Sequence, residues 1–302
     1  MTVPVRVISG DRLTRNDDPP GAILSETITA VRAVLGEDCG GLSVARATFG
    51  LFFTGVKLSN GVGGICATAI KPIPEAVCCP SSAKALPIPG RIRGYPVTDF
   101  IDDLGSPSSL KRVLGIAVLS ALSATVMLKS PLGDDQLLSG VDGLDEARIG
   151  DSDHVVVVGA LITLIKALKA RGRPFRILEK DPATLKPDEM CFYAPAETAP
   201  LEVPAADVLV TTGTTLINDT LEGLLGLVRP GAEIVVVGPT ASLLPEAFFR
   251  RGVRVLAGVN VSDADGLLDT LAEGGSGYHI FGRSAERIVM RARTSDVAAT
   301  GG

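Results

Sequence analysis

The chain has 302 residues and a formal net charge of −5 at pH 7, and no basic stripe runs along it, which argues against nucleic-acid binding. Hydrophobic residues make up 46% of the sequence, aromatic residues only 4%, and tryptophan is absent. A core of Ala, Val, Leu and Ile is typical of α/β proteins with parallel sheets, and the length predicts about two domains.

The N-terminus and the cysteines indicate a cytoplasmic protein. The segment MTVPVRVISGDR has no apolar h-region, so we expect no signal peptide. The cysteines are odd in number, form no C-x-x-C pair and include two adjacent residues, which favours reduced thiols over a disulfide framework. They are Cys39, Cys66, Cys78, Cys79 and Cys191.

The first half of the chain predicts helices and one hairpin. Ala22–Leu35 is an amphipathic helix that follows a Pro- and Asp-rich turn. Within Ala47–Ala69, the Asn60-Gly61 pair lies between two alternating runs, which is the strongest short hairpin signal. The glycines at 61, 63 and 64 predict a bulge or a backbone that another group approaches closely. Seven prolines between residues 71 and 107 predict an irregular passage.

A long apolar helix is expected from about Ser108 to Lys129. Its segment Val113–Leu128 is almost uncharged, but its 16 residues are short of the roughly 20 that cross a bilayer. Small residues along this segment favour close packing, so we interpret it as a buried helix. The Asp- and Gly-rich stretch 130–152 is the best domain boundary, and residues 1–150 are predicted to form a smaller α+β domain.

From residue 151 to 302 strand and helix patterns alternate, which predicts a doubly wound, Rossmann-like parallel sheet. The expected strands are His154–Gly159, Phe175–Glu179, Val208–Val210, Ile234–Val237, Val253–Ala257 and Arg287–Arg291. The expected helices are Leu161–Ala170, Leu216–Leu227, Leu244–Arg250 and Ala264–Glu273.

Ligands of open parallel sheets bind outside the carboxyl ends of the strands, and two of these ends are rich in Gly and Thr. Each is expected to run into a helix, whose N-terminus favours anions and small polar ligands. One N-cap needs a single hydroxyl, so the excess of threonines in the first turn favours ligand contact. The predicted ligand-binding residues are Thr212, Gly213, Thr214, Thr215, Asn218, Gly238, Pro239 and Thr240.

Three side chains are candidates for catalysis or metal binding: Glu179, Asp219 and His279. Each also has an ordinary interpretation, respectively a solvated strand end, a charge that suits a helix dipole and an incidental histidine in a glycine-rich loop. A classical NAD site is not expected, because VVVVGALITL has one glycine where the dinucleotide fingerprint needs three. A thiolate metal site would need cysteines from separate segments to meet in space.

Three runs of the second half match a known pattern: TGTTLINDTLEGLL (Thr212–Leu225), VVVGPTASLLPEAFFRRGVRVLAG (Val235–Gly258) and the segment Asp263–Gly275. They resemble the heavy-metal chelation domain family, in which a Rossmann-like C-terminal domain carries a TG-[ST]-TL-x-N-x-T run and a later GP-[ST]. The resemblance covers about residues 20 to 292 and implies an N-terminal domain similar to that of enolase. This chain has Ser120 where relatives tend to have Asn.

The resemblance implies metal handling, with a divalent metal ion as the cofactor. Our first hypothesis is a protein that binds or delivers a metal ion or small metal complex in an interdomain cleft, within a cofactor or metallophore pathway. The alternative is an enzyme that acts on a small anionic metabolite bound at the Thr-rich turn. A third alternative is a non-catalytic scaffold of a larger assembly. The apolar composition favours a homo-oligomer, whereas no nucleic-acid or membrane partner is expected.

Overall fold

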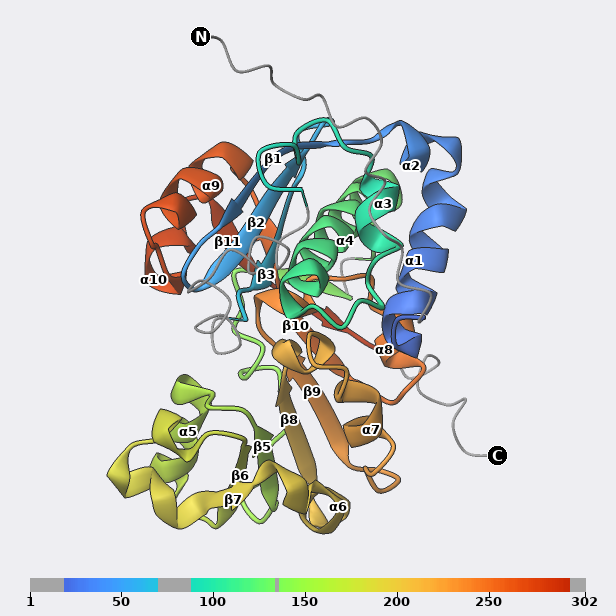
Figure 1. Ribbon diagram of the computed structural model, residues 1–302. Coiled ribbons are helices and arrows are strands. Elements are labelled where there is room, and N and C mark those ends of the chain that lie inside the picture. Colours follow the sequence, from blue (N-terminus) through green and yellow to red (C-terminus); the bar gives the residue numbers. More distant parts are fainter. Residues whose placement is uncertain (1–18, 70–87, 134–135, 294–302) are drawn as a thin grey trace, which may run out of the picture.

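The computed structural model describes residues 19–69, 88–133 and 136–293, and these form two sheets (Figure 1). The three-stranded antiparallel sheet contains β1 (Val44–Phe49), β2 (Phe53–Leu58) and β3 (Gly63–Ala67). The eight-stranded sheet contains β4 (Leu137–Ser139), β5 (Val155–Val158), β6 (Phe175–Glu179), β7 (Tyr193–Pro195), β8 (Val208–Thr212), β9 (Glu233–Val237), β10 (Val255–Val261) and β11 (Ala285–Arg291). The predicted α/β fold class is confirmed.

The larger sheet has the strand order β4-β11-β10-β9-β8-β5-β6-β7. The strands from β10 to β7 in this order run parallel, whereas β11 and β4 are antiparallel additions at one edge. The parallel strands have the Rossmann arrangement. The chain adds β6 and β7 on one side of β5 and then adds β8, β9 and β10 on the other, so the strand order reverses between β5 and β8. A crevice is expected at this reversal, outside the carboxyl ends of the two strands. The domain boundary at residue 150 stays a prediction, and β4, which precedes it, belongs to the larger sheet.

The helices are α1 (Ala22–Leu35), α2 (Glu37–Gly41), α3 (Val97–Ile101), α4 (Ser109–Lys129), α5 (Ile162–Arg171), α6 (Ala199–Glu202), α7 (Leu221–Leu225), α8 (Glu246–Phe249), α9 (Ala264–Ala272) and α10 (Gly277–Ile280). α1 has the predicted bounds, because its buried residues return every three or four positions and Gly36, at φ 55°, ends it. Ser108 caps α4 by accepting a hydrogen bond from the backbone N–H of Lys111 at 3.5 Å.

The connections after β8 and β9 contain less helix than the sequence predicts. The expected helix Leu216–Leu227 is replaced by a 3₁₀ turn, Gly213–Leu216, and the five residues of α7. Asp219 lies between them with a φ of 59°, in the left-handed region that interrupts a helix. The short strands β4 and β7 were not predicted, because three residues are too few to show a period.

The small sheet lies between two helices that are far apart in the sequence (Figure 1). α4 packs on one face, and α9, which follows β10, packs against β1 and β2 on the other. β2 and β3 form the predicted hairpin, with Gly61 at a φ of 87° in its turn. The close approach predicted at its glycines is confirmed at Gly63 and Gly64, but not at Gly61, where an added Cβ would meet open space. A Cβ added at Gly63 would lie 2.5 Å from the side chain of Val261, and one at Gly64 would overlap the backbone of α4.

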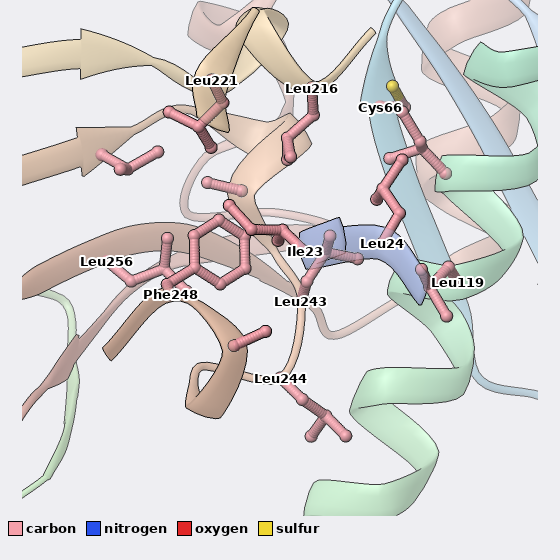
Figure 2. Packing of buried hydrophobic residues seen from close by; sticks show 14 of the residues in the cluster. Ile23, Leu24, Cys66, Leu119, Leu216, Leu221, Leu243, Leu244, Phe248 and Leu256 are labelled. Carbon is pink, nitrogen blue, oxygen red and sulfur yellow. The ribbon is translucent and has the colours of Figure 1, made fainter. Parts of the chain in front are cut away.

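One continuous hydrophobic core joins the N-terminal elements to one face of the larger sheet (Figure 2). Phe248 of α8 lies at its centre, with Ile23 of α1 and Leu256 of β10 packed nearby. α4 is long and apolar enough to cross a membrane, but 78% of its most apolar window is buried inside the protein. This burial agrees with the core helix predicted for Val113–Leu128, since a buried helix can be apolar on all sides.

An ion-pair cluster at the edge of this core predicts pH-dependent stability. The carboxylate of Glu26 on α1 accepts hydrogen bonds from Arg251 at 2.5 Å and from Arg250, and these bonds lower the pKa of Glu26 from 4.5 to about 2. Because Glu26 is partly exposed, we expect Glu26→Gln to lower the free energy of unfolding at pH 7 by only about 1–2 kcal/mol.

The lowered pKa fixes the sign of this pH dependence. The difference between wild type and Glu26→Gln should be constant well above pH 4.5 and shrink as the pH falls through 2, below which both chains carry a neutral side chain. Urea denaturation at several pH values measures it, with the exposed Glu273 changed to Gln as the control. A difference that grows as the pH falls would contradict the prediction.

Candidate functional site

A cavity of about 290 Å³ lies at the carboxyl ends of β5, β6 and β8, where the strand order reverses. We call it the switch-point cavity. It is lined by Val158, Gly159, Leu178, Glu179, Lys180, Ala196, Glu197, Thr212, Thr214, Thr215, Asn218, Thr220 and Leu224. The position agrees with the general rule for ligand sites in open parallel sheets, and it brings together four of the eight predicted ligand-binding residues: Thr212, Thr214, Thr215 and Asn218.

The threonines of the bend after β8 bond largely to one another. The hydroxyl of Thr215 donates to the carbonyl of Thr212 at 2.7 Å, and the hydroxyl of Thr214 lies 3.2 Å from that of Thr212. Thr211 is buried and also donates to the carbonyl of Thr212, at 3.4 Å. The bend itself therefore uses hydroxyls that sequence reasoning assigned to a ligand, and Thr212 and Thr214 are the half-buried ones that face the cavity.

The helix N-terminus predicted beside this bend is absent, and that expectation was wrong. Asn218 and Asp219 lie in the connection between the 3₁₀ turn and α7, not in the first turn of a helix. Without aligned N–H groups of a long helix, the bend lacks the dipole that would favour an anion. The side chains of Asn218 and Thr220 contribute the polar groups here, with the Thr220 hydroxyl donating to the Asn218 amide oxygen at 2.6 Å.

Glu179 lies at the end of β6, where its carboxylate accepts hydrogen bonds from three backbone N–H groups beside the cavity. One carboxylate oxygen accepts from the backbone N–H of Ala160 at 3.1 Å, and the other accepts from the N–H groups of Lys180 at 2.8 Å and Asp181 at 3.3 Å. These bonds tie the turn after β5 to the end of β6. Glu179 lines the cavity, but its oxygens are already engaged with backbone donors.

The bend after β9 does not share a hollow with the bend after β8, although both were predicted to form one site. The bends touch, since a Cβ added at Gly213 would lie 2.8 Å from the backbone nitrogen of Ala241. Gly238 and Pro239 instead line a second cavity, of about 370 Å³, and Thr240 is buried. The described residues that line these two cavities all come from Val141 onward, so neither is bounded by the hairpin of β2 and β3.

Thr240 joins the two sheets. Its hydroxyl accepts a hydrogen bond from the backbone N–H of Ala67 on β3 at 3.1 Å and lies 3.8 Å from the sulfur of Cys66. On the other side of the hairpin, the hydroxyl of Ser120 accepts from the N–H of Ile65 at 3.3 Å. Both polar side chains therefore satisfy the backbone of β3, a structural role that the sequence did not reveal.

Neither Asp219 nor His279 lines the switch-point cavity. Asp219 is paired with Arg112 of α4, whose Nη2 is 3.3 Å from its carboxylate. His279 is exposed on α10, and its Nδ1 accepts from the N–H of Ser276 at 3.0 Å. Of the three predicted catalytic or metal-binding candidates, only Glu179 lines the cavity.

The described part of the chain contains no group of three or more His, Cys, Asp or Glu side chains placed to hold a metal ion. Cys66 is fully buried, and this burial raises the pKa of its thiol to about 12, so it is a poor thiolate ligand. Cys39 is buried with a raised pKa, also through desolvation, and Cys191 is exposed. Cys78 and Cys79 lie outside the described residues.

Sequence reasoning missed four of the cavity residues that follow strand ends: Lys180, Ala196, Glu197 and Thr220. Ala196 and Glu197 directly follow β7, so recognising that short strand would have placed them at the carboxyl edge of the sheet. Arg112 was also missed. It is a charged residue at the start of a long apolar helix, and such a position favours a buried ion pair.

Sequence and structure comparisons agree on one family. A sequence model described as "Putative heavy-metal chelation" matches residues 142–290, and a second model with the same description matches residues 32–123. An uncharacterized protein of Methanocaldococcus jannaschii is 28% identical over 170 residues, which are 55% of this chain and 61% of that protein. The chain therefore spans less than two thirds of the length of this relative.

Two solved structures of the DUF364 family, both of proteins of unknown function, have a similar fold. The protein of Pyrococcus horikoshii has a TM-score of 0.70 and 19% identity over 89% of this chain and 100% of its own. The protein of Desulfitobacterium hafniense has a TM-score of 0.65 and 17% identity over 89% of this chain and 98% of its own. With both halves matched by its sequence models and the fold shared with its solved members, the chain belongs to this heavy-metal chelation family.

Proposed function

We propose that the protein binds a small metal complex, in which an organic chelator already holds the ion, in the switch-point cavity. The description of the family supports metal binding in general. The observation that favours a complex over a bare ion is the lining of the cavity, where hydroxyl and amide side chains outnumber charged ones and Glu179 is engaged with backbone donors. Hydroxyl and amide groups form hydrogen bonds with the oxygens and nitrogens of a chelator, whereas they are poor ligands for the heavy-metal ion itself.

The cavity has the size and the mixed character of a small-ligand site. Its volume of about 290 Å³ is near the lower limit for small-molecule pockets, which are about 300–1,000 Å³. Val158, Leu178 and Leu224 provide an apolar wall, whereas Thr214 and Asn218 provide polar groups. Lys180 and Glu197, both exposed at the rim, offer charges of either sign to a polar chelator.

A bare-ion site does not fit the described residues. Glu179, Asp219 and His279 do not meet, and each already holds a backbone N–H or an arginine. Heavy-metal ions need two to four soft or imidazole ligands around one point, and no such group is found in the described ranges. The metal ion is therefore proposed to bind as part of a complex, in which the organic chelator supplies its ligands.

The test compares chelated and free metal. Equilibrium dialysis against Fe³⁺–citrate, Ni²⁺–histidine, free Ni²⁺ and free Co²⁺, followed by elemental analysis, should show retention of at least one complex and little retention of the free ions. Thr214→Val and Asn218→Ala should each weaken binding of that complex by about tenfold, because each removes a polar contact. Thr29→Val, an exposed threonine on α1, is the matched control.

Two results would contradict the proposal. The first is that the protein binds a free metal ion as tightly as it binds the complex of that ion, since the protein would then supply the metal ligands itself. The second is that neither complex binds, or that both variants bind it like the wild type. The cytoplasmic location, the homo-oligomer and the site between domains remain predictions, and no described residue of the smaller sheet lines the switch-point cavity.

The alternative, an enzyme that acts on a small anionic metabolite, has less support. The helix N-terminus that would have bound the anion is absent, and Glu179 is the only one of the three acid–base candidates in the cavity. Lys180, beside it, is the remaining group that attracts an anion. If an activity is found, unchanged turnover in Glu179→Ala would exclude Glu179 as the acid or base.

A further inference from the structure

We propose that the second cavity binds a small carboxylate with an aromatic or branched aliphatic body, separately from any ligand of the switch-point cavity. The second cavity, of about 370 Å³, lies at the carboxyl ends of β9 and β10. The turn after β5 separates the two cavities, because Gly159 lines the first and Ala160 the second. The proposal therefore does not depend on the proposed function.

The walls of the second cavity are mainly apolar and come from several elements. Val237 ends β9, Val259 belongs to β10 and Ile288 to β11, and the loop before β5 adds Leu144. Leu164 of α5 also lines the cavity. A hydrocarbon body placed here loses its contact with water, which is favourable in proportion to the apolar surface that is buried.

One arginine is positioned to bind the head group. Arg287 on β11 stacks its guanidinium over the ring of Phe281 at 4.3 Å, and both residues line the cavity. Its nearest carboxylate, on Asp142, is 3.9 Å from Nε, which is beyond hydrogen-bond distance. Within the described ranges, no hydrogen bond from the two terminal nitrogens of Arg287 is found.

The orientation of Arg287 favours a carboxylate. The contact with Phe281 limits the movement of the guanidinium, and a guanidinium presents two parallel N–H groups that match the two oxygens of a carboxylate. Asp142 is engaged with the loop, since it accepts a hydrogen bond from the N–H of Leu144 at 3.1 Å. It offsets part of the charge of Arg287 but leaves the terminal nitrogens to the ligand.

The mouth of the cavity exposes two large side chains. Tyr278 of α10 is 97% exposed and Ile162 of α5 is 66% exposed, and both line the cavity. The two helices lie on the same side of the molecule in Figure 1. Exposed aromatic and aliphatic groups beside an apolar cavity commonly mark a ligand site, because a ligand covers them on binding. They would cover an aromatic ring whose carboxylate is held by Arg287.

Phenylacetate is the probe, and phenethylamine, which has the same ring with a cationic head, is its counterpart. Titration calorimetry and saturation-transfer NMR should show saturable binding of phenylacetate with a Kd of about 1 mM or below, and no binding of phenethylamine. Arg287→Gln should weaken phenylacetate binding about tenfold, through loss of a charge-assisted pair. Tyr278→Ala, at a fully exposed position, should fold normally and weaken binding about threefold.

Two controls separate this site from others. Arg283→Gln removes a nearby exposed arginine that does not line the cavity, and Asn218→Ala alters only the switch-point cavity. Both variants should bind phenylacetate like the wild type, and a metal complex should not displace it. The proposal is overturned if phenylacetate fails to saturate, if phenethylamine binds equally well, or if Arg287→Gln and Tyr278→Ala both bind like the wild type.

Discussion

Gly64→Ala is expected to abolish stable folding, with a loss of about 4 kcal/mol or more in the free energy of unfolding. A Cβ at this position would overlap the carbonyl oxygen of Ala117 and the backbone nitrogen of Ala121, both on α4. Neither group can move independently, because β3 is paired with β2 and α4 is a continuous buried helix. Soluble yield and urea denaturation measure the effect.

Gly223→Ala is the matched control for this substitution. Gly223 lies in α7, and no heavy atom comes within 4 Å of an added Cβ. Alanine there should leave the stability unchanged or raise it by about 0.5–1 kcal/mol, because it has the higher helix propensity. If Gly64→Ala denatures at the same urea concentration as the wild type, then the close contact of α4 with β3 is not required for the fold.

Arg112→Met is expected to lower the free energy of unfolding by about 2–4 kcal/mol and to loosen one wall of the switch-point cavity. Arg112 is only 7% exposed, and its Nη2 donates to the carbonyl of Leu216 at 2.9 Å and to Asp219 at 3.3 Å. Methionine keeps much of the packing volume but leaves this carbonyl without its charged donor. Urea denaturation measures the stability.

Amide hydrogen exchange measures the local effect of Arg112→Met. The N–H groups of residues 218–220 should exchange faster in the variant, because Arg112 holds the carbonyl of Leu216 and the carboxylate of Asp219 to α4. Lys166→Met, which changes an exposed residue of α5, should alter neither stability nor exchange at these positions. Equal exchange rates in wild type and Arg112→Met would show that Arg112 is not needed to hold this wall of the cavity in place.

The strands and the hairpin were largely predictable, because their signals are local. The alternation of β-branched runs with helical patterns predicted the parallel strands β5, β6, β8, β9 and β10, and Asn60-Gly61 predicted the hairpin. The prediction of a helix at Leu216–Leu227 was wrong, because contacts with residues far away in the sequence override the local signal. Its sequence has helical periodicity, but tertiary contacts hold Asp219 in the left-handed region, and one such residue ends a helix.

The candidate site was predicted in part. The carboxyl-end rule placed Thr212, Thr214 and Glu179 at the correct edge of the sheet, and the structure adds that they line one cavity. The rule does not say which face of the sheet a strand end serves. It therefore could not show that Gly238 and Pro239 line the second cavity and not the switch-point cavity.

The sequence by itself determined the fold class, the helix at Ala22–Leu35 and the strand ends that line the cavities, because these follow from periodicity and propensity among near neighbours. Only the tertiary structure decided which strand ends share a cavity. That choice depends on how the small sheet packs: Thr240 bonds to β3, Ala241 fills the space beside Gly213, and the two bends therefore touch and leave separate cavities on their two sides. Contacts between residues far apart in the sequence leave no local pattern by which they can be predicted.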